Sequence, residues 1–379
     1  VSYLASASLF KAQLLLGFLL ICLSCGKGNN QYLISGYTMG TTYNIKLISP
    51  SNELSTIPIK NEIDSLLIIL NKQMSTWDDE SEISKFNSWE SLEPFKVSEN
   101  FLYVVDNAID ISIKTSGVFD ITIFDLMALW GFGPRPESRF PEEKDIDRVL
   151  DFTGYEKIRL GSSSIIKSNK KTKIDLNAIA KGYGVDIVFN FLKNKGFDNF
   201  FVEIGGEVRF AGNNKNNKLW STGIEDPIGV NEQQNTLCAV LNLTNRAIAT
   251  SGNYKNFVDN DGVILGHTIS PITGYPIKTD VLSVTVLSKQ CMIADAWATA
   301  LMAMDFETGL DIINSDPNLD AVWVVRDNNS SGPNGVAGEW GHNQIPYFAA
   351  KKENFDSSNP REAEIESFLS GLSLAKRFK

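Results

Sequence analysis

Two oxygen-bearing side chains stand four residues apart in an otherwise apolar segment. Asp295 and Thr299 interrupt residues 292–304, a run dominated by alanine, methionine and leucine. Helical spacing would place both on one face of a helix, and burial of a carboxylate is costly unless it is paired or bound to a cation. A carboxylate beside a hydroxyl suits Mg²⁺, which prefers oxygen ligands and completes its shell with phosphate and water. The pair is a candidate magnesium site; the alternative is an aspartate that caps a helix or forms a salt bridge.

A second polar segment, residues 175–184, leads from the end of a predicted strand into a helix. Asp175 and Asn177 precede the helix, and Lys181 lies in its first turn. Free N–H groups at a helix N-terminus favour phosphate, whereas a lysine there opposes the helix dipole, so that a nearby anion would compensate for it. The segment is a candidate phosphate site, unless Asp175 or Asn177 merely caps the helix.

His267 is one of only two histidines, and it directly precedes a turn that is rich in proline and glycine. Loops beside a cleft often carry acid–base residues, and histidine titrates near neutral pH. A solvent-exposed turn histidine without a chemical role is the alternative. His342 lies in a weakly patterned C-terminal segment and is set aside.

The usual nucleotide signatures are absent from the sequence. It contains neither a Walker A loop nor a G-x-G-x-x-G motif between a strand and a helix, so a nucleotide would need a different arrangement of ligands. The formal net charge of -10 argues against a nucleic-acid partner, because phosphate-backbone binding needs a basic surface.

Apolar periodicity predicts the elements that would position these side chains. Helices are expected over residues 58–74, 98–116, 178–195 and 292–304. In the second of these we expect the buried face to carry Leu102, Val105, Ile109 and Ile113. Strands are expected within residues 32–47, broken at 39–42, in a hairpin over 200–210, and near 237–243, 263–270, 281–287 and 321–325.

Strands that come in hairpins between long helices favour an α+β fold, in which antiparallel sheets pack against helices, over a parallel Rossmann sheet. Residues 118–133 are expected to be apolar and irregular, and residues 134–143 to form an exposed loop. We predict one domain over residues 32–327 and a peripheral C-terminal tail over residues 328–379.

The first residues resemble a bacterial lipoprotein signal peptide. An apolar run over residues 14–23, too short to span a bilayer, precedes Ser24 and Cys25. We therefore predict a signal peptide over residues 1–24, acylation of Cys25, a tether over residues 25–31, and an exported protein anchored on the periplasmic side of a membrane. Cys22 stands where leucine is usual, and an uncleaved anchor or an ordinary secretory peptide is the alternative. Export would permit a disulfide between Cys238 and Cys291, although two unpaired thiols are equally compatible.

Nine short motifs follow one another along the chain, at residues 39–42, 74–77 with 81–82, 119–122, 129–133, 175–182, 203–207, 249–252, 267–276 and 294–299. In this order they resemble the ApbE family of FAD:protein FMN transferases, over roughly residues 36–304. A lipoprotein start is common in that family. The resemblance implies a T-fold-like α+β architecture of antiparallel sheets and helices.

The resemblance also implies the site residues. FAD would be bound by Met39, Trp77, Val118, Phe119, Asp120, Asp175, Lys181 and Ile269. Magnesium would be held by the carbonyl of Ala178 together with Asp295 and Thr299. Two positions depart from the family pattern: Phe124-Asp125 stands where Gly-Pro is usual, and Trp77 replaces a more usual tyrosine, which still allows stacking on a flavin or adenine ring.

The implied reaction is magnesium-dependent transfer of FMN from FAD to a threonine hydroxyl of an acceptor flavoprotein, such as a subunit of a membrane redox complex. AMP would leave, and His267 or a neighbouring carboxylate would take the hydroxyl proton. The product would be FMN in phosphoester linkage. The alternatives are an FAD pyrophosphatase, in which water replaces the acceptor, and a non-catalytic FAD-binding lipoprotein.

Overall fold

The computed structural model describes residues 29–137, 139–225, 227, 237–252, 257–260, 263–266, 268–326 and 346–350. The predicted signal peptide, Cys25, His267 and most of the predicted tail therefore lie outside the described residues.

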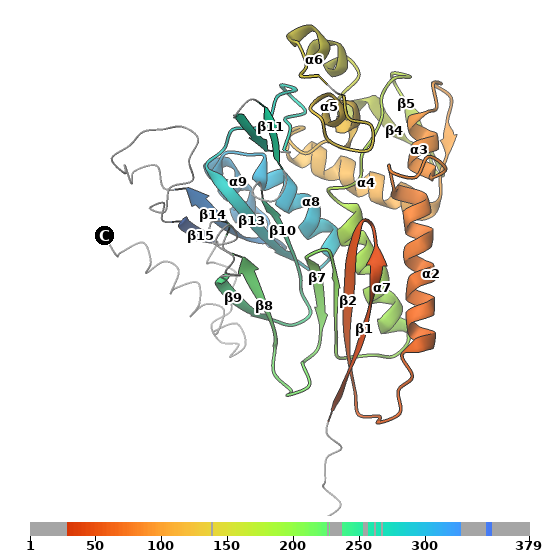
Figure 1. Cartoon of the computed structure of the whole chain (residues 1–379), viewed down its shortest axis with the longest axis vertical. Coiled ribbons are helices and arrows are strands. Elements are labelled where there is room, and N and C mark those ends of the chain that lie inside the picture. Colours follow the sequence, from red (N-terminus) through yellow and green to blue (C-terminus); the bar gives the residue numbers. More distant parts are fainter. Residues whose placement is uncertain are drawn as a thin grey trace, which may run out of the picture.

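An eight-stranded sheet forms the centre of the fold, and each neighbouring pair of its strands is antiparallel. The sheet crosses the molecule from the N-terminal hairpin to the C-terminal strands (Figure 1). Its strands in spatial order are β1 (Asn30–Thr38), β2 (Thr41–Ser49), β6 (Phe200–Ile204), β7 (Glu207–Ala211), β10 (Ala247–Gly252), β13 (Val281–Ser288), β14 (Asp320–Arg326) and β15 (Pro346–Ala350).

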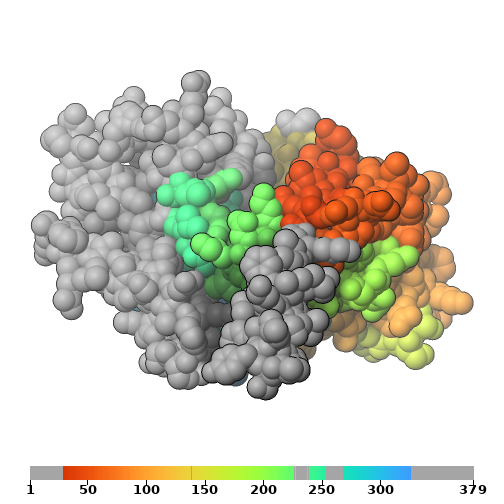
Figure 2. All heavy atoms as spheres, turned by 90° about the horizontal axis from the view of Figure 1, so that it is seen from below, coloured from red at the N-terminus to blue at the C-terminus, as the bar shows by residue number. Residues whose placement is uncertain are grey.

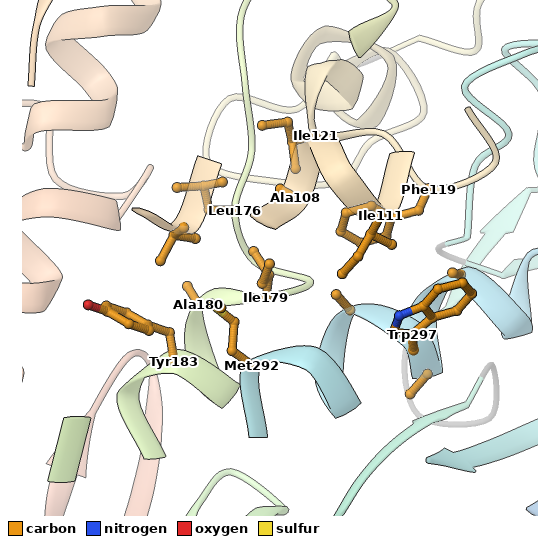
Figure 3. Close-up of a cluster of buried hydrophobic side chains, with 14 of the residues drawn as sticks. Ala108, Ile111, Phe119, Ile121, Leu176, Ile179, Ala180, Tyr183, Met292 and Trp297 are labelled. Carbon is orange, nitrogen blue, oxygen red and sulfur yellow. The ribbon is translucent and has the colours of Figure 1, made fainter. Parts of the chain in front are cut away.

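Helices cover one face of this sheet and bury most of the core. Side chains from α2, α4, α7 and α8 form two large apolar clusters with the strands. Figure 3 shows Ala180 and Tyr183 of α7 beside Met292 of α8, with Trp297 further along α8. The helices are α2 (Ile57–Met74), α3 (Glu82–Asn87), α4 (Glu99–Lys114), α5 (Phe124–Leu129), α6 (Glu143–Leu150), α7 (Ala180–Asn194), α8 (Cys291–Met302) and α9 (Phe306–Ser315), with short 3₁₀ helices η1 (Ile121–Ile123) and η2 (Tyr155–Lys157).

A two-stranded ribbon contributes to the core on the other face of the sheet. Strands β8 (Trp220–Glu225) and β9 (Leu237–Leu243) pair with each other and pack against side chains of β7, β10 and β13. Figure 2, seen from below, shows green segments of the chain next to the red N-terminal ones. Two smaller sheets join β3 (Phe95–Lys96), β5 (Ser164–Lys167) and β4 (Ile158–Leu160), and β11 (Phe257–Asn260) with β12 (Val263–Gly266).

Strand β7 shows how alternation assigns side chains to the two faces. Val208 and Phe210 enter the cluster beneath the β8–β9 ribbon, whereas Arg209 reaches Asp186 of α7, with Nη1 2.6 Å from Oδ1. Asp186 also accepts hydrogen bonds from the backbone N–H groups of Cys291 and Met292, each at 2.9 Å. A carboxylate of α7 thus caps the N-terminus of α8 and fixes the two helices against each other.

The predicted fold class and most predicted elements are confirmed. The structure is α+β, and the hairpins and the four long helices lie where the periodicity placed them, with α7 beginning at Ala180. The predicted buried face of α4 is correct in part. Val105 is buried, and Leu102 and Ile109 pack partly against the core. Ile113 is exposed, contrary to the prediction, whereas Phe101, Val104 and Ala108, which were not predicted, are buried. Residues 118–133, expected to be irregular, contain η1 and α5.

Three further findings bear on the predictions for the tail, the cysteines and the membrane. Strand β15 lies within the segment that we expected to be a peripheral tail, and it pairs with β14 as the last strand of the sheet. Cys291 has a free, buried thiol, as in the unpaired alternative. Among the described helices, none combines the length and apolar character that crossing a membrane would require.

Lys167 of β5 is a buried cation without a hydrogen-bonding partner among the described residues. Its side chain is 1% exposed, and Nζ lies 4.6 Å from the centre of the Phe86 ring. Burial, with a contribution from the charge of Lys173, lowers the pKa of Lys167 from 10.5 to about 8. The unfolded chain therefore binds a proton between these pH values that the folded chain has lost, so the free energy of unfolding rises with pH across this interval.

We expect Lys167→Met to stabilise the protein by about 1–3 kcal/mol at pH 7, because it removes the cost of a buried charge and loses only a cation–π contact. Urea unfolding at pH 7 and pH 9.5 measures this gain, which should shrink at the higher pH. Lys171→Met is the matched control, because exposed Lys171 also lies over an aromatic ring, that of Phe152. A less stable Lys167→Met protein at pH 7 would contradict the interpretation.

Candidate active site

The first turn of α7 meets the middle of α8 at a glycine. A side chain at Gly182 would collide with the backbone of Cys291 and would bring its Cβ 2.8 Å from Cβ of Asp295. This close approach lets the N–H of Gly182 donate a hydrogen bond of 2.9 Å to Oδ2 of Asp295. Asp295 is 4% exposed, and its burial raises its pKa, against the opposing effects of Lys181 and of this hydrogen bond.

Lys181 lies between two buried carboxylates. Its Nζ donates a hydrogen bond to Oε1 of Glu207 on β7 and lies 3.9 Å from Oδ1 of Asp295. Burial alone would lower the pKa of Lys181, but the charges of Asp295 and Glu207 outweigh it and raise the pKa. Burial, followed by the charge of Asp295, raises the pKa of Glu207. One lysine beside two carboxylates leaves negative charge that a cation would balance.

The three predicted magnesium ligands belong to this junction. Thr299 lies one turn after Asp295 on α8, and its Oγ1 is 3.1 Å from Oγ of Ser251 on β10. The N–H of Gly182 is bound to Asp295 rather than to the carbonyl of Ala178, its partner in an ideal helix, and among the described residues no hydrogen bond reaches that carbonyl. A carboxylate, a hydroxyl and a free carbonyl therefore offer hard oxygen ligands beside each other in the fold, as Mg²⁺ prefers.

Within the described ranges, no group of three or more histidine, cysteine, aspartate or glutamate side chains could hold a metal ion. Asp295, Thr299 and the carbonyl of Ala178 would supply three oxygen ligands, and the octahedral shell of Mg²⁺ has room for three more. Mg²⁺ commonly takes such oxygens from substrate phosphates and water, so the donor set fits a magnesium ion that binds together with a phosphorylated ligand.

Two tight turns flank the junction. Met39 begins the β1–β2 turn with a left-handed φ of 49°, and its Sδ reaches the backbone of α7 at Gly184. In the β6–β7 turn, Gly205 has a φ of 63°, and a side chain there would contact that of Thr41, with Cβ 2.8 Å from Cγ2. The structure thus brings Met39 and Lys181 to the same end of α7.

The predicted residues Val118, Phe119, Asp120 and Asp175 form a second group. The N–H of Asp175 donates to the carbonyl of Ile121 at 2.7 Å, which ties both segments together. Phe119 is buried in the core and Val118 packs partly against it. Figure 3 shows Phe119 beside Ile111 and Trp297.

The two carboxylates of this group differ in their hydrogen bonds. Oδ1 of Asp120 accepts hydrogen bonds from the N–H and hydroxyl groups of Thr122, and Oδ2 accepts one from the N–H of Tyr155. Both oxygens therefore stabilise the local backbone. Burial raises the pKa of Asp120 against these hydrogen bonds. Among the described residues, the carboxylate of Asp175 is bonded only to Asn177 two residues along, and burial raises its pKa to about 6 against these hydrogen bonds.

The remaining predicted residues lie in loops. Trp77, after α2, is 69% exposed, which leaves its ring free to stack on a planar ligand. The Ile269 side chain is buried in a separate cluster with Trp130, so only its backbone could face a ligand. His267 lies outside the described residues, and the site as described therefore lacks its predicted base.

The ApbE family model matches residues 39–323. A protein of Vibrio cholerae named FAD:protein FMN transferase is 41% identical over 82% of this chain and 92% of its own length. The chain belongs to the ApbE family. A Haemophilus influenzae protein of the same name is 34% identical over 81% of this chain and 90% of its own. The solved flavin transferase ApbE from Vibrio cholerae superposes with a TM-score of 0.72 at 38% identity, covering 79% of this chain and 95% of that one.

Two polar residues of this ApbE protein were not among the predicted site residues. Glu207 holds Lys181, and Ser251 contacts Thr299. A signal for Glu207 was present, since strand alternation places it on the same face of β7 as Arg209, toward α7. Ser251 had no such signal, because β10 was not predicted as a strand.

Proposed function

We propose that this chain transfers the FMN half of FAD to a hydroxyl of an acceptor protein. The observation that carries the proposal is the cluster of Lys181 with the buried carboxylates of Glu207 and Asp295, which lies where a helix N-terminus meets candidate magnesium ligands. Relatives that align over most of their length are named for this reaction.

Asp295, Thr299 and the carbonyl of Ala178 would hold magnesium. When bound, the ion would neutralise charge on the pyrophosphate and stabilise the departing phosphate. Lys181 would donate to a pyrophosphate oxygen, which its place at the start of α7 favours. The exposed ring of Trp77 would stack on a planar part of FAD and orient it.

The proposed chemistry forms one bond and breaks one. A threonine hydroxyl of the acceptor attacks the phosphorus of the FMN half, the bond from that phosphorus to the bridging oxygen breaks, and AMP leaves with the bond's electron pair. The hydroxyl proton passes to His267 or to a nearby carboxylate. No oxidant or reductant is needed, and the flavin ring keeps its redox state.

Mass spectrometry of an acceptor tests the proposal. The full chain would be incubated with FAD, Mg²⁺ and the flavin-free subunit of a membrane redox complex from the same organism. A threonine whose mass increases by that of FMN less water supports transfer, with one AMP released per modified chain. Free FMN and AMP with an unmodified acceptor would point instead to a pyrophosphatase, and unchanged FAD to a binding protein.

We also propose that the protein is exported and anchored by a lipid on Cys25, supported by the apolar run over residues 14–23. Cys25→Ser should abolish incorporation of labelled fatty acid and move the protein from the membrane to the soluble fraction after lysis. Cys22→Ser is the matched control and should remain acylated. A wild-type protein that carries no lipid would contradict the anchor.

A further inference from the structure

One carboxylate oxygen next to the proposed FAD site has no hydrogen-bond partner in the part of the chain that the structure describes. Glu207 is 4% exposed, and its Oε1 accepts the hydrogen bond from Lys181. Its Oε2 is buried and has no hydrogen-bond partner among the residues that the structure describes. Since a buried acceptor without a donor costs free energy, this oxygen indicates that a donor joins it when the site is filled.

The free oxygen faces the two turns at the end of α7. It lies 3.5 Å from the place that a Cβ would take at Gly205, a residue whose positive φ favours glycine. Thr41, at the start of β2, lines the same place from the other side. Glycine at position 205 keeps side-chain atoms away from Oε2 of Glu207, on the side of the carboxylate that lies against the β6–β7 turn.

The charges around Oε2 of Glu207 indicate which kind of ligand group could donate a hydrogen bond to it. An ionised carboxylate only accepts hydrogen bonds, so a phosphate oxygen would be repelled, whereas a hydroxyl would bind. Lys181, which shares this carboxylate, and the neighbouring Asp295 mark the pyrophosphate end of the site. In FAD the donors nearest to the pyrophosphate are the hydroxyls of the ribityl chain on one side and of the ribose on the other.

We propose that Glu207 is a substrate-binding residue, whose Oε2 accepts a hydrogen bond from a sugar hydroxyl next to the pyrophosphate of FAD while Oε1 holds Lys181. This inference rests on the proposed function, because it takes FAD as the ligand. Glu207 would then contribute to binding of two parts of FAD that meet at the reacting centre. It would position Lys181 for the charged pyrophosphate, and it would bind the sugar hydroxyl directly. The same carboxylate gives the site a preference for a nucleotide over a pyrophosphate that carries no sugar.

The first measurement is the affinity for FAD, by titration calorimetry with Mg²⁺ and without an acceptor. Glu207→Gln should bind FAD about 10- to 100-fold more weakly, as expected when a hydrogen bond to a charged group is replaced. Glu203→Gln is the matched control, because Glu203 lies in the same hairpin, is only partly buried, and is bonded to Asn44 and to the N–H of Gly206. Its affinity for FAD should equal that of the wild type.

Two FAD analogues separate the hydroxyl contact from an effect through Lys181. One lacks the ribityl hydroxyl nearest to the phosphate, and the other lacks the ribose 3′-hydroxyl. One of them should bind the wild type about tenfold or more weakly than FAD, yet should bind Glu207→Gln about as well as FAD does. The analogue that behaves in this way identifies which half of FAD supplies the hydroxyl.

Three outcomes would overturn the proposal. Equal affinity of both analogues and FAD for the wild type would remove the hydroxyl contact, whatever the variant does. Equal penalties in wild type and Glu207→Gln would mean that Glu207 acts only through Lys181. A variant with unchanged FAD affinity but slowed transfer would assign Oε2 to the acceptor hydroxyl instead. The rate of FMN transfer by the wild type, measured in parallel, tests the proposed function separately, because the binding measurements need no acceptor.

Discussion

Asp295→Asn is expected to lower magnesium-dependent FMN transfer by about 10³-fold or more, while the protein stays folded. The asparagine keeps the shape of the side chain, and its carbonyl oxygen can still accept from the N–H of Gly182. What it removes is the one carboxylate in the proposed ligand set. Because Mg²⁺ depends on charged oxygen ligands, the ion should bind far more weakly, and its stabilisation of the departing phosphate should be lost.

Binding of FAD should suffer less than turnover, because Trp77 and Lys181 remain. Calorimetric titration of Mg²⁺ into the FAD complex measures the metal site directly, and single-turnover rates over a range of Mg²⁺ concentrations measure the chemistry. Asp305→Asn is the matched control, since Asp305 only caps α9. If Asp295→Asn transfers FMN at the wild-type rate in the presence of a chelator, the metal assignment fails.

The spacing of Asp295 and Thr299 could be predicted because a helix repeats locally. Four residues separate them in the sequence, and the structure places both on α8 with Asp295 buried. What the sequence could not supply was the partner of Asp295: Gly182 lies 113 residues away. The approach of α7 to α8 depends on tertiary packing, which the local periodicity of the sequence does not reveal.

The error in α4 has a similar cause. Apolar residues occupy more than one face of this helix, so period alone does not say which face meets the core. The structure buries Phe101, Val104 and Ala108, and leaves Ile113 exposed. Lys167 is a second example: its position in β5 alternates with that of Ile166, but only packing beneath Phe86 shows that a lysine is buried there.

The position of Glu207 could be predicted from the sequence only in part. Alternation along β7 predicts the face that it shares with Arg209, but not its neighbours on that face. Both residues pair with charged groups of other elements, Lys181 of α7 for one and Asp186 of α7 for the other. A buried glutamate and a largely buried arginine two residues apart are costly unless such partners exist. Two charged residues on the inner face of a predicted strand therefore indicate that oppositely charged groups face them.

His267→Ala is expected to slow FMN transfer by about 10²–10⁴-fold, the usual contribution of a general base. The prediction rests on the sequence position of His267, between β12, which ends at Gly266, and the turn that follows. That turn is held in place: Ile269 bridges to Pro276, and Nε1 of Trp130 donates to the carbonyl of Gly274 at 2.7 Å. A side chain next to such an anchored segment can be oriented reproducibly without filling the core.

Single-turnover rates across pH 5.5–9 decide whether His267 is the base. Histidine titrates within this interval in its ordinary state, so the wild-type rate should fall toward acid and the His267→Ala rate should lose that fall. Affinity for FAD and the unfolding midpoint should stay at wild-type values, which separates a chemical role from a structural one. If the variant keeps the wild-type rate and pH profile, Asp175 becomes the next candidate, because burial raises its pKa to about 6 and, of the residues that the structure describes, only Asn177 binds its carboxylate oxygens. Asp120 is the weaker choice, since Thr122 and Tyr155 already bind both of its oxygens.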